Sequence, residues 1–162
     1  MTEAEFKKHL GAAEKSPKEI AAAILGLQVG TLRYKPSPEK WCILEILAHL
    51  ADMEVVLSYR MRQMLADDKP VIAPIDQDAW ARSLHYMEMA PAELVALYGL
   101  NRHASLQLLR RIKHEDLNKS AYHPEMKRDM TVAEIVERMG VHGASHLGQI
   151  ERLKKEAGRK PN

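Results

Sequence analysis

The sequence predicts an all-α protein, a four-helix bundle with an additional short helix. Apolar residues recur at intervals of three and four through four long segments, and no segment alternates between apolar and polar residues for long. Proline, glycine and aspartate gather between these segments, where helices end. The chain has 162 residues, enough to bury a real core, and this length predicts one domain over residues 1–162.

The first two long helices are predicted from their punctuation. The first covers residues 2–27, and we expect it to be broken or kinked at Pro17, which lacks the backbone N–H that a helix uses. The second covers about 38–66, with Ser37 as its N-cap and Pro38 at its first position. A helix of that length can span a bundle.

The second half of the chain is expected to hold a short helix over about 76–88 and a third long helix over about 91–112. An extended connection over 113–130 follows. A Thr-x-x-Glu capping box at Thr131 then opens the last helix, which runs over about 132–157.

Two histidines lie one turn apart in the last helix. His142 and His146 share a helical face and fall along its apolar stripe with Met139 and Ile150. A buried imidazole without a partner costs about 1–3 kcal/mol. A metal ion would satisfy both rings, and so would a buried carboxylate or hydroxyl group.

His49 is the candidate for a third ligand, since it shares a face of the second helix with Ile46 and Met53. Three inward imidazoles can converge on one divalent ion, and Zn, Ni, Fe and Mn all accept imidazole nitrogen. Protons compete for the same nitrogens, so metal binding is expected to weaken as the pH falls through about 6.5. The alternative for such histidines is ordinary core packing or surface exposure.

Other residues near these histidines have two interpretations each. Gln149 and Asp52 follow His146 and His49 by three residues and could orient an imidazole or a metal-bound water. The alternatives are a helix–helix contact for Gln149 and a surface carboxylate for Asp52. Cys42 lies about 10 Å along the helix from His49, too far to share its ion, and is expected to be a small buried group. His123 could line the mouth of a pocket, but we expect a surface or capping role.

Composition excludes several classes of protein. Lys and Arg number 24 against 22 Asp and Glu, a net charge of +2 that gives no reason to expect nucleic acid. No apolar run reaches the ~18 residues of a membrane span, and the N-terminus has no signal-peptide pattern. A single cysteine excludes an intrachain disulfide, which favours a cytoplasmic location.

Two segments resemble the signatures of the DinB/YfiT-like superfamily. The run PEKWCILEILAHL from Pro38 is similar to its second-helix signature, and HGASHLGQI from His142 is similar to its last-helix signature. The resemblance spans nearly the whole chain, with Cys42 standing where the family often has serine. It implies a bundle of DinB/YfiT type in which His49, His142 and His146 bind a divalent metal. Because relatives are often dimers, a homodimer is also expected.

Three neutral imidazoles leave the ion its full charge and at least one exchangeable position, the pattern of a catalytic site. The reacting group would then be a metal-bound water or thiolate, with no protein nucleophile. The superfamily that the chain resembles includes thiol S-transferases, a thiol-dependent isomerase and proteins described as metal-dependent hydrolases, so the resemblance implies an activity of one of these kinds. We therefore expect a metal-dependent transferase that adds a low-molecular-weight thiol to a small electrophilic substrate. A hydrolase using metal-bound hydroxide and a non-catalytic, stress-associated metal-binding protein are the alternatives.

Overall fold

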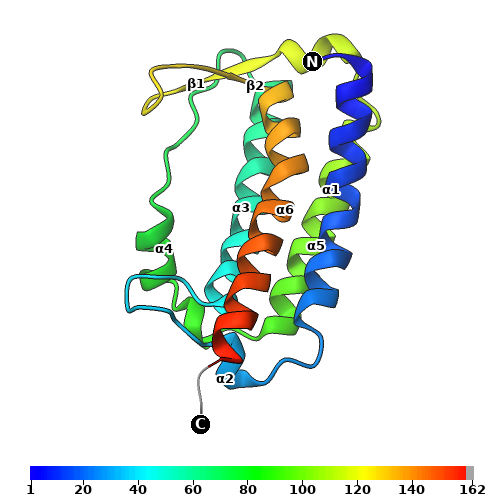
Figure 1. The fold of residues 1–162 in the computed structure, drawn as a ribbon. Helices are drawn as coiled ribbons and strands as arrows, with labels where there is room; N and C mark the ends of the chain where they lie inside the picture. The colour runs from blue at the N-terminus through cyan, green and yellow to red at the C-terminus, as the bar shows by residue number, and fades with distance from the viewer. Residues whose placement is uncertain (160–162) are drawn as a thin grey trace.

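Four long helices run side by side in the computed structural model, which describes residues 1–159 (Figure 1). Each contacts two neighbours, so that the order around the bundle is first, last, second and third long helix. The predicted four-helix bundle is therefore confirmed. No helix among the described residues is long and apolar enough to cross a bilayer. The long helices are α1 (Glu3–Ile24), α3 (Ile43–Ala66), α5 (Pro91–Leu109) and α6 (Val132–Ala157).

Short elements join the long helices. The helix α2 (Val29–Leu32) lies between α1 and α3, at the end of the bundle opposite the N-terminus (Figure 1). The predicted short helix is α4 (Gln77–Ser83), followed by one 3-10 turn, η1 (Tyr86–Glu88). Asp76 caps α4 by accepting hydrogen bonds from two backbone N–H groups of its first turn.

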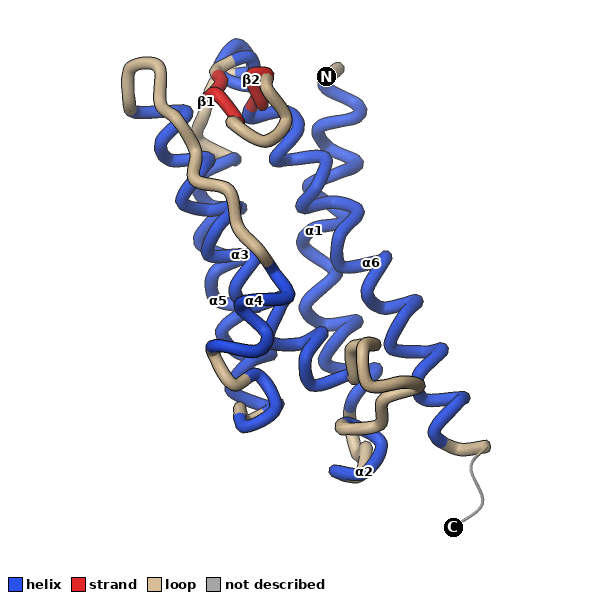
Figure 2. Tube along the Cα trace, turned by 90° about the vertical axis from the view of Figure 1, so that its left-hand side faces the viewer, coloured by secondary structure: helices blue, strands red, loops and turns tan. Residues whose placement is uncertain are grey.

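A β-hairpin that the sequence did not predict lies between α5 and α6. After a 3-10 helix η2 (His114–Asn118), strand β1 (Ser120–His123) pairs antiparallel with β2 (Arg128–Thr131). Figure 2 shows the hairpin at one end of the bundle, where the segment between α3 and α4 begins its descent. That segment is joined to β1, because Ile72 N–H donates to the Tyr122 carbonyl at 3.0 Å. Neither strand sequence, SAYH or RDMT, alternates strictly between polar and apolar residues, so periodicity does not predict them.

The start of α3 corrects the prediction. Ser37 is not its N-cap, since residues 37–40 form a turn in which Lys40 N–H donates to the Ser37 carbonyl at 3.0 Å. The helix begins at Ile43 with Cys42 as N-cap. The Glu45 carboxylate accepts the Cys42 N–H at 2.9 Å and takes the place of an ordinary capping side chain.

Helix α1 continues through Pro17 without the predicted break. Proline has no N–H to offer the carbonyl four residues earlier, which belongs to Ala13. Arg102 of α5 makes up for this loss by donating from Nη1 to the Ala13 carbonyl at 3.3 Å. A hydrogen bond between helices therefore stands in for one within the helix.

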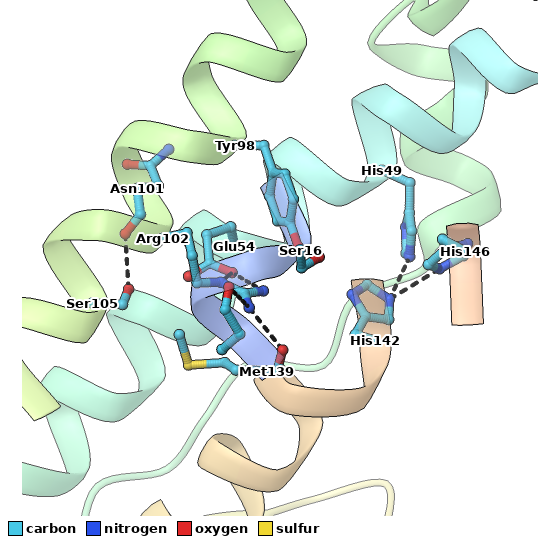
Figure 3. A network of polar contacts seen from close by, with 11 residues as sticks. Ser16, His49, Glu54, Tyr98, Asn101, Arg102, Ser105, Met139, His142 and His146 are labelled. Atoms are coloured by element: carbon cyan, nitrogen blue, oxygen red, sulfur yellow. Dashed lines mark hydrogen bonds and ion pairs between the residues drawn. The ribbon is translucent and has the colours of Figure 1, made fainter. Parts of the chain in front are cut away.

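A buried polar layer divides the apolar core into two clusters, one on either side of it. Arg102 and Glu54 are each 1% exposed, and Arg102 Nε donates to Glu54 Oε2 at 2.8 Å (Figure 3). Arg102 Nη1 also donates to the Met139 carbonyl of α6 at 2.7 Å. Beside them, the hydroxyl groups of Ser16 and Tyr98 lie 2.8 Å apart. Side-chain or backbone groups of all four long helices thus meet in this polar layer.

Candidate metal centre

Three imidazole rings point toward one another across the interface of α3 and α6 (Figure 3). His142 Nε2 lies 3.2 Å from His49 Nε2 and 3.1 Å from His146 Nε2. One nitrogen from each ring falls within 4.8 Å of the others. The structure therefore brings together the three histidines that the sequence singled out as candidate ligands.

The position of each ring follows from its helix. His49 is 3% exposed and lies in a stretch of α3 that is buried on every side, with the Trp41 ring packed 4.9 Å from it, centroid to centroid. His142 and His146 are half-buried on the inner face of α6. Between them, Gly143 allows α6 to approach α1, since a Cβ atom there would lie 1.7 Å from Ser16 Oγ.

Two of the three nitrogen separations fit one metal ion, and the third is within 4.8 Å. Two nitrogens that each bind an ion at about 2.0–2.1 Å lie at most about 4.2 Å apart, and the two closest separations here satisfy that limit. A neutral ring nitrogen carries either a proton or a lone pair, so His142 Nε2 cannot make a full hydrogen bond to both neighbours at once. A divalent cation satisfies all three lone pairs together.

Burial keeps the rings neutral, which is the state that binds metal. Loss of solvation, followed by the nearby His146, lowers the pKa of His49 to about 3. Desolvation and the other two rings lower the pKa of His142 to about 2, and burial also lowers the pKa of His146. All three rings therefore have a pKa below the ordinary histidine value of about 6.5.

Gln149 makes one of the contacts considered for it. His146 Nδ1 donates to Gln149 Oε1 at 3.1 Å, which fixes the proton on Nδ1 and leaves the Nε2 lone pair facing the other rings. Asp52 does not contact the rings within the described part of the chain. Its carboxylate accepts a hydrogen bond from the Tyr86 hydroxyl instead.

Cys42 lies apart from the three rings. Its side chain is fully buried, and Sγ donates to Met87 Sδ at 3.3 Å. Burial raises the pKa of this thiol, which disfavours the reactive thiolate. The expectation of a small buried group is confirmed.

A cavity of about 410 Å³ opens beside the histidines. Trp41, Gln77, Arg138 and Gln149 contribute to its wall. Sequence reasoning missed Gln77 and Arg138. Arg138 lies one turn before His142 in α6, so helical spacing alone could have found it. Gln77 lies in α4, and only the tertiary structure brings it to the site.

The fold and the site together define a helical-bundle protein with a three-histidine centre beside an open cavity. The sequence model of the DinB superfamily matches residues 12–150, and the chain belongs to this superfamily.

Similar proteins share most of the chain. A Geobacillus thermodenitrificans protein named "Putative metal-dependent hydrolase" is 27% identical over 95% of this chain and 86% of its own. YfiT of Bacillus subtilis, which bears the same description, is 22% identical over 93% of this chain and 85% of its own. The solved structure of YfiT, described as having "an unusual four-helix bundle topology", superposes with a TM-score of 0.91 at 21% identity. It covers 99% of this chain and 91% of that chain.

Proposed function

We propose that this protein is a divalent-metal-dependent enzyme that transfers a low-molecular-weight thiol to a small electrophile. The observation that carries the proposal is the set of three neutral imidazoles, His49, His142 and His146, on the wall of a cavity of about 410 Å³. A ligand set of three histidines is typical of catalytic rather than structural sites, because it leaves a position for an exchangeable group.

The three histidines would hold the ion through their Nε2 atoms. When bound, a divalent ion held by neutral ligands supplies Lewis acidity, which favours the deprotonated form of a thiol or water. The protein's own residues set the conditions for this. Gln149 holds a proton on His146 Nδ1 and so keeps its Nε2 free, and Trp41 covers one side of the His49 ring.

Thiol transfer is favoured over hydrolysis by the placement of the carboxylates. Metal-assisted hydrolysis commonly uses a carboxylate as general base beside the ion. Here Glu39 and Asp78, the carboxylates that line the cavity, are exposed, and neither bonds to a ring among the described residues. A thiol has an ordinary pKa of about 8.5 and is deprotonated on a metal without a protein base.

Hydrolysis by metal-bound hydroxide is the second candidate, and the names of the relatives favour it. One experiment separates the two. The purified protein is analysed for metals, then loaded with the metal found and mixed with cysteine and 1-chloro-2,4-dinitrobenzene. The cysteine sulfur attacks the ring carbon that bears chlorine, so a C–S bond forms and a C–Cl bond breaks. Chloride leaves, and the thiol proton goes to solvent.

Metal-dependent formation of the thioether that is lost in His142→Ala and kept in His103→Ala would support thiol transfer. His103 is a matched control because it is an exposed histidine that does not line the cavity. Metal-dependent hydrolysis of 4-nitrophenyl acetate without thiol, and no thioether, would favour the second candidate. Protein that carries stoichiometric metal but catalyses neither reaction contradicts both.

A further inference from the structure

A second cavity, of about 260 Å³, adjoins the metal cavity. The two share Gln77 and Arg138 in their walls. The second cavity is lined by residues of α3, the segment between α3 and α4, the start of α4, the β-hairpin and α6. One part of its wall is apolar and consists of Met53, Leu57, Ile75, Met126 and Met130.

Arg60 gives this cavity a buried positive charge. The residue is 7% exposed, and within residues 1–159 its guanidinium makes one hydrogen bond, from Nη2 to the Ala73 carbonyl at 2.6 Å. No carboxylate lies within ion-pair distance of it in the part of the chain that the structure describes. A buried charge without a counter-ion is unfavourable, so the site is set up for an anion that is not part of the protein.

A second positively charged side chain, that of Arg138, lies near Arg60. Burial and the neighbouring Arg138 lower the pKa of Arg60, whereas the exposed Glu125 raises it. Arg138 forms no ion pair with any residue from 1 to 159. Two arginines therefore line this cavity together with one solvent-exposed carboxylate, that of Glu125.

His123 supplies a further polar group, and here the structure corrects the sequence. The residue is 6% exposed and lines the cavity, so the surface role expected from the sequence is wrong and the pocket role is the one it takes. Its Nδ1 accepts the Met126 N–H at 3.5 Å, so the neutral ring carries its proton on Nε2. This ring is thus a hydrogen-bond donor on the cavity wall.

We propose that the cavity of Arg60 and Arg138 is a subsite for the anionic end of the substrate, a carboxylate or phosphate monoester on a short apolar chain. The guanidinium groups would bind the anion, and the methionines would contact the chain. The opposite end of the substrate would then reach the three histidines across the boundary between the two cavities, where Gln77 and Arg138 line both. The proposal rests on the proposed function in one respect, which is that the bound anion is the substrate of the thiol-transfer reaction.

The test measures anion binding to metal-free protein by calorimetry, because a carboxylate could otherwise coordinate the metal. Hexanoate, hexyl phosphate and the neutral hexanamide are the probes. Wild type should bind an anion about tenfold or more tightly than the amide. Binding of either anion supports the proposal, and the tighter of the two identifies the headgroup.

Variants locate the subsite. Arg60→Met should abolish the preference for the anion, and Arg60→Lys should keep part of it. Arg62→Met is the matched control, since Arg62 lies on the same helix but is exposed, and it should bind as wild type does. If Arg60→Met does not fold, Arg138→Gln takes its place, because Arg138 is exposed and should still lose several-fold in anion affinity.

Equal binding of hexanoate and hexanamide by wild type would overturn the proposal. So would an anion preference that survives both Arg60→Met and Arg138→Gln. The result is independent of turnover. Anion binding without thiol transfer rejects the proposed function alone, and metal-dependent transfer without anion binding rejects this subsite alone.

Discussion

Replacing Gln149 by alanine should weaken metal binding without removing a ligand. The substitution deletes the acceptor that lies 3.1 Å from His146 Nδ1. Loss of such a partner typically costs about 10–100-fold in metal affinity, which corresponds to about 1.4–2.7 kcal/mol. Gln149 contacts one of the three ligands, His146. No side chain within residues 1–159 bonds Nδ1 of His49 or His142, so these two ligands do not depend on such a contact. We therefore expect a loss of about tenfold, at the lower end of this range.

The assay is a competitive titration of metal-free protein with Zn²⁺ against a chelating indicator. Gln149→Glu keeps an acceptor at the same place and should retain wild-type affinity or exceed it. Ser145→Ala is the control, because Ser145 is an exposed residue of the same helix. If Gln149→Ala binds Zn²⁺ as tightly as wild type while His146→Ala has lost the site, then the hydrogen bond does not orient the ligand.

Three further predictions concern the nucleophile, the pH dependence and the polar layer. Cys42→Ser should keep most thiol-transfer activity and His142→Ala should lose it while circular dichroism stays native; a dead Cys42→Ser together with an active metal-free protein would make Cys42 the nucleophile. The metal-free protein should lose stability as the pH falls below about 6.5, because unfolded histidines bind protons that the rings, with a pKa of about 3 for His49 and about 2 for His142, do not. Urea unfolding at several pH values should show that the free energy of unfolding changes by about 1.4 kcal/mol per pH unit for each such histidine. The slope should be smaller in His142→Gln, and equal slopes in this variant and in wild type would contradict the assignment. Arg102→Met should cost about 3–5 kcal/mol in the free energy of unfolding by leaving Glu54 buried and unpaired, and the double variant with Glu54→Leu should regain part of it; strictly additive losses would show that the pair is not coupled.

The features that the sequence predicted correctly are those that local spacing determines. Helix α6 runs over Val132–Ala157 as expected, because its capping box at Thr131 and its apolar period are both local signals. The convergence of His49 with His142 and His146 followed from their phase on two amphipathic helices. A bundle requires those apolar faces to meet, so the rings on them meet too.

The features that were missed depend on contacts between distant segments. Ser37 resembles an N-cap in sequence, but Glu45 reaches back to Cys42 and sets the start of α3 five residues later than expected from Pro38. The cavity around Arg60 arises because the chain after α3 returns along the bundle and pairs with β1. No periodicity in the sequence records that path.

The polar layer has a consequence for how the protein folds. Arg102 takes partners from three other helices: the Glu54 carboxylate, the Met139 carbonyl and the Ala13 carbonyl left free by Pro17. Any three-helix intermediate that buries Arg102 lacks at least one of these partners, and an unsatisfied buried group costs about 1–3 kcal/mol or more when charged. Partial assemblies are therefore penalised, and the four helices should dock in a single cooperative step.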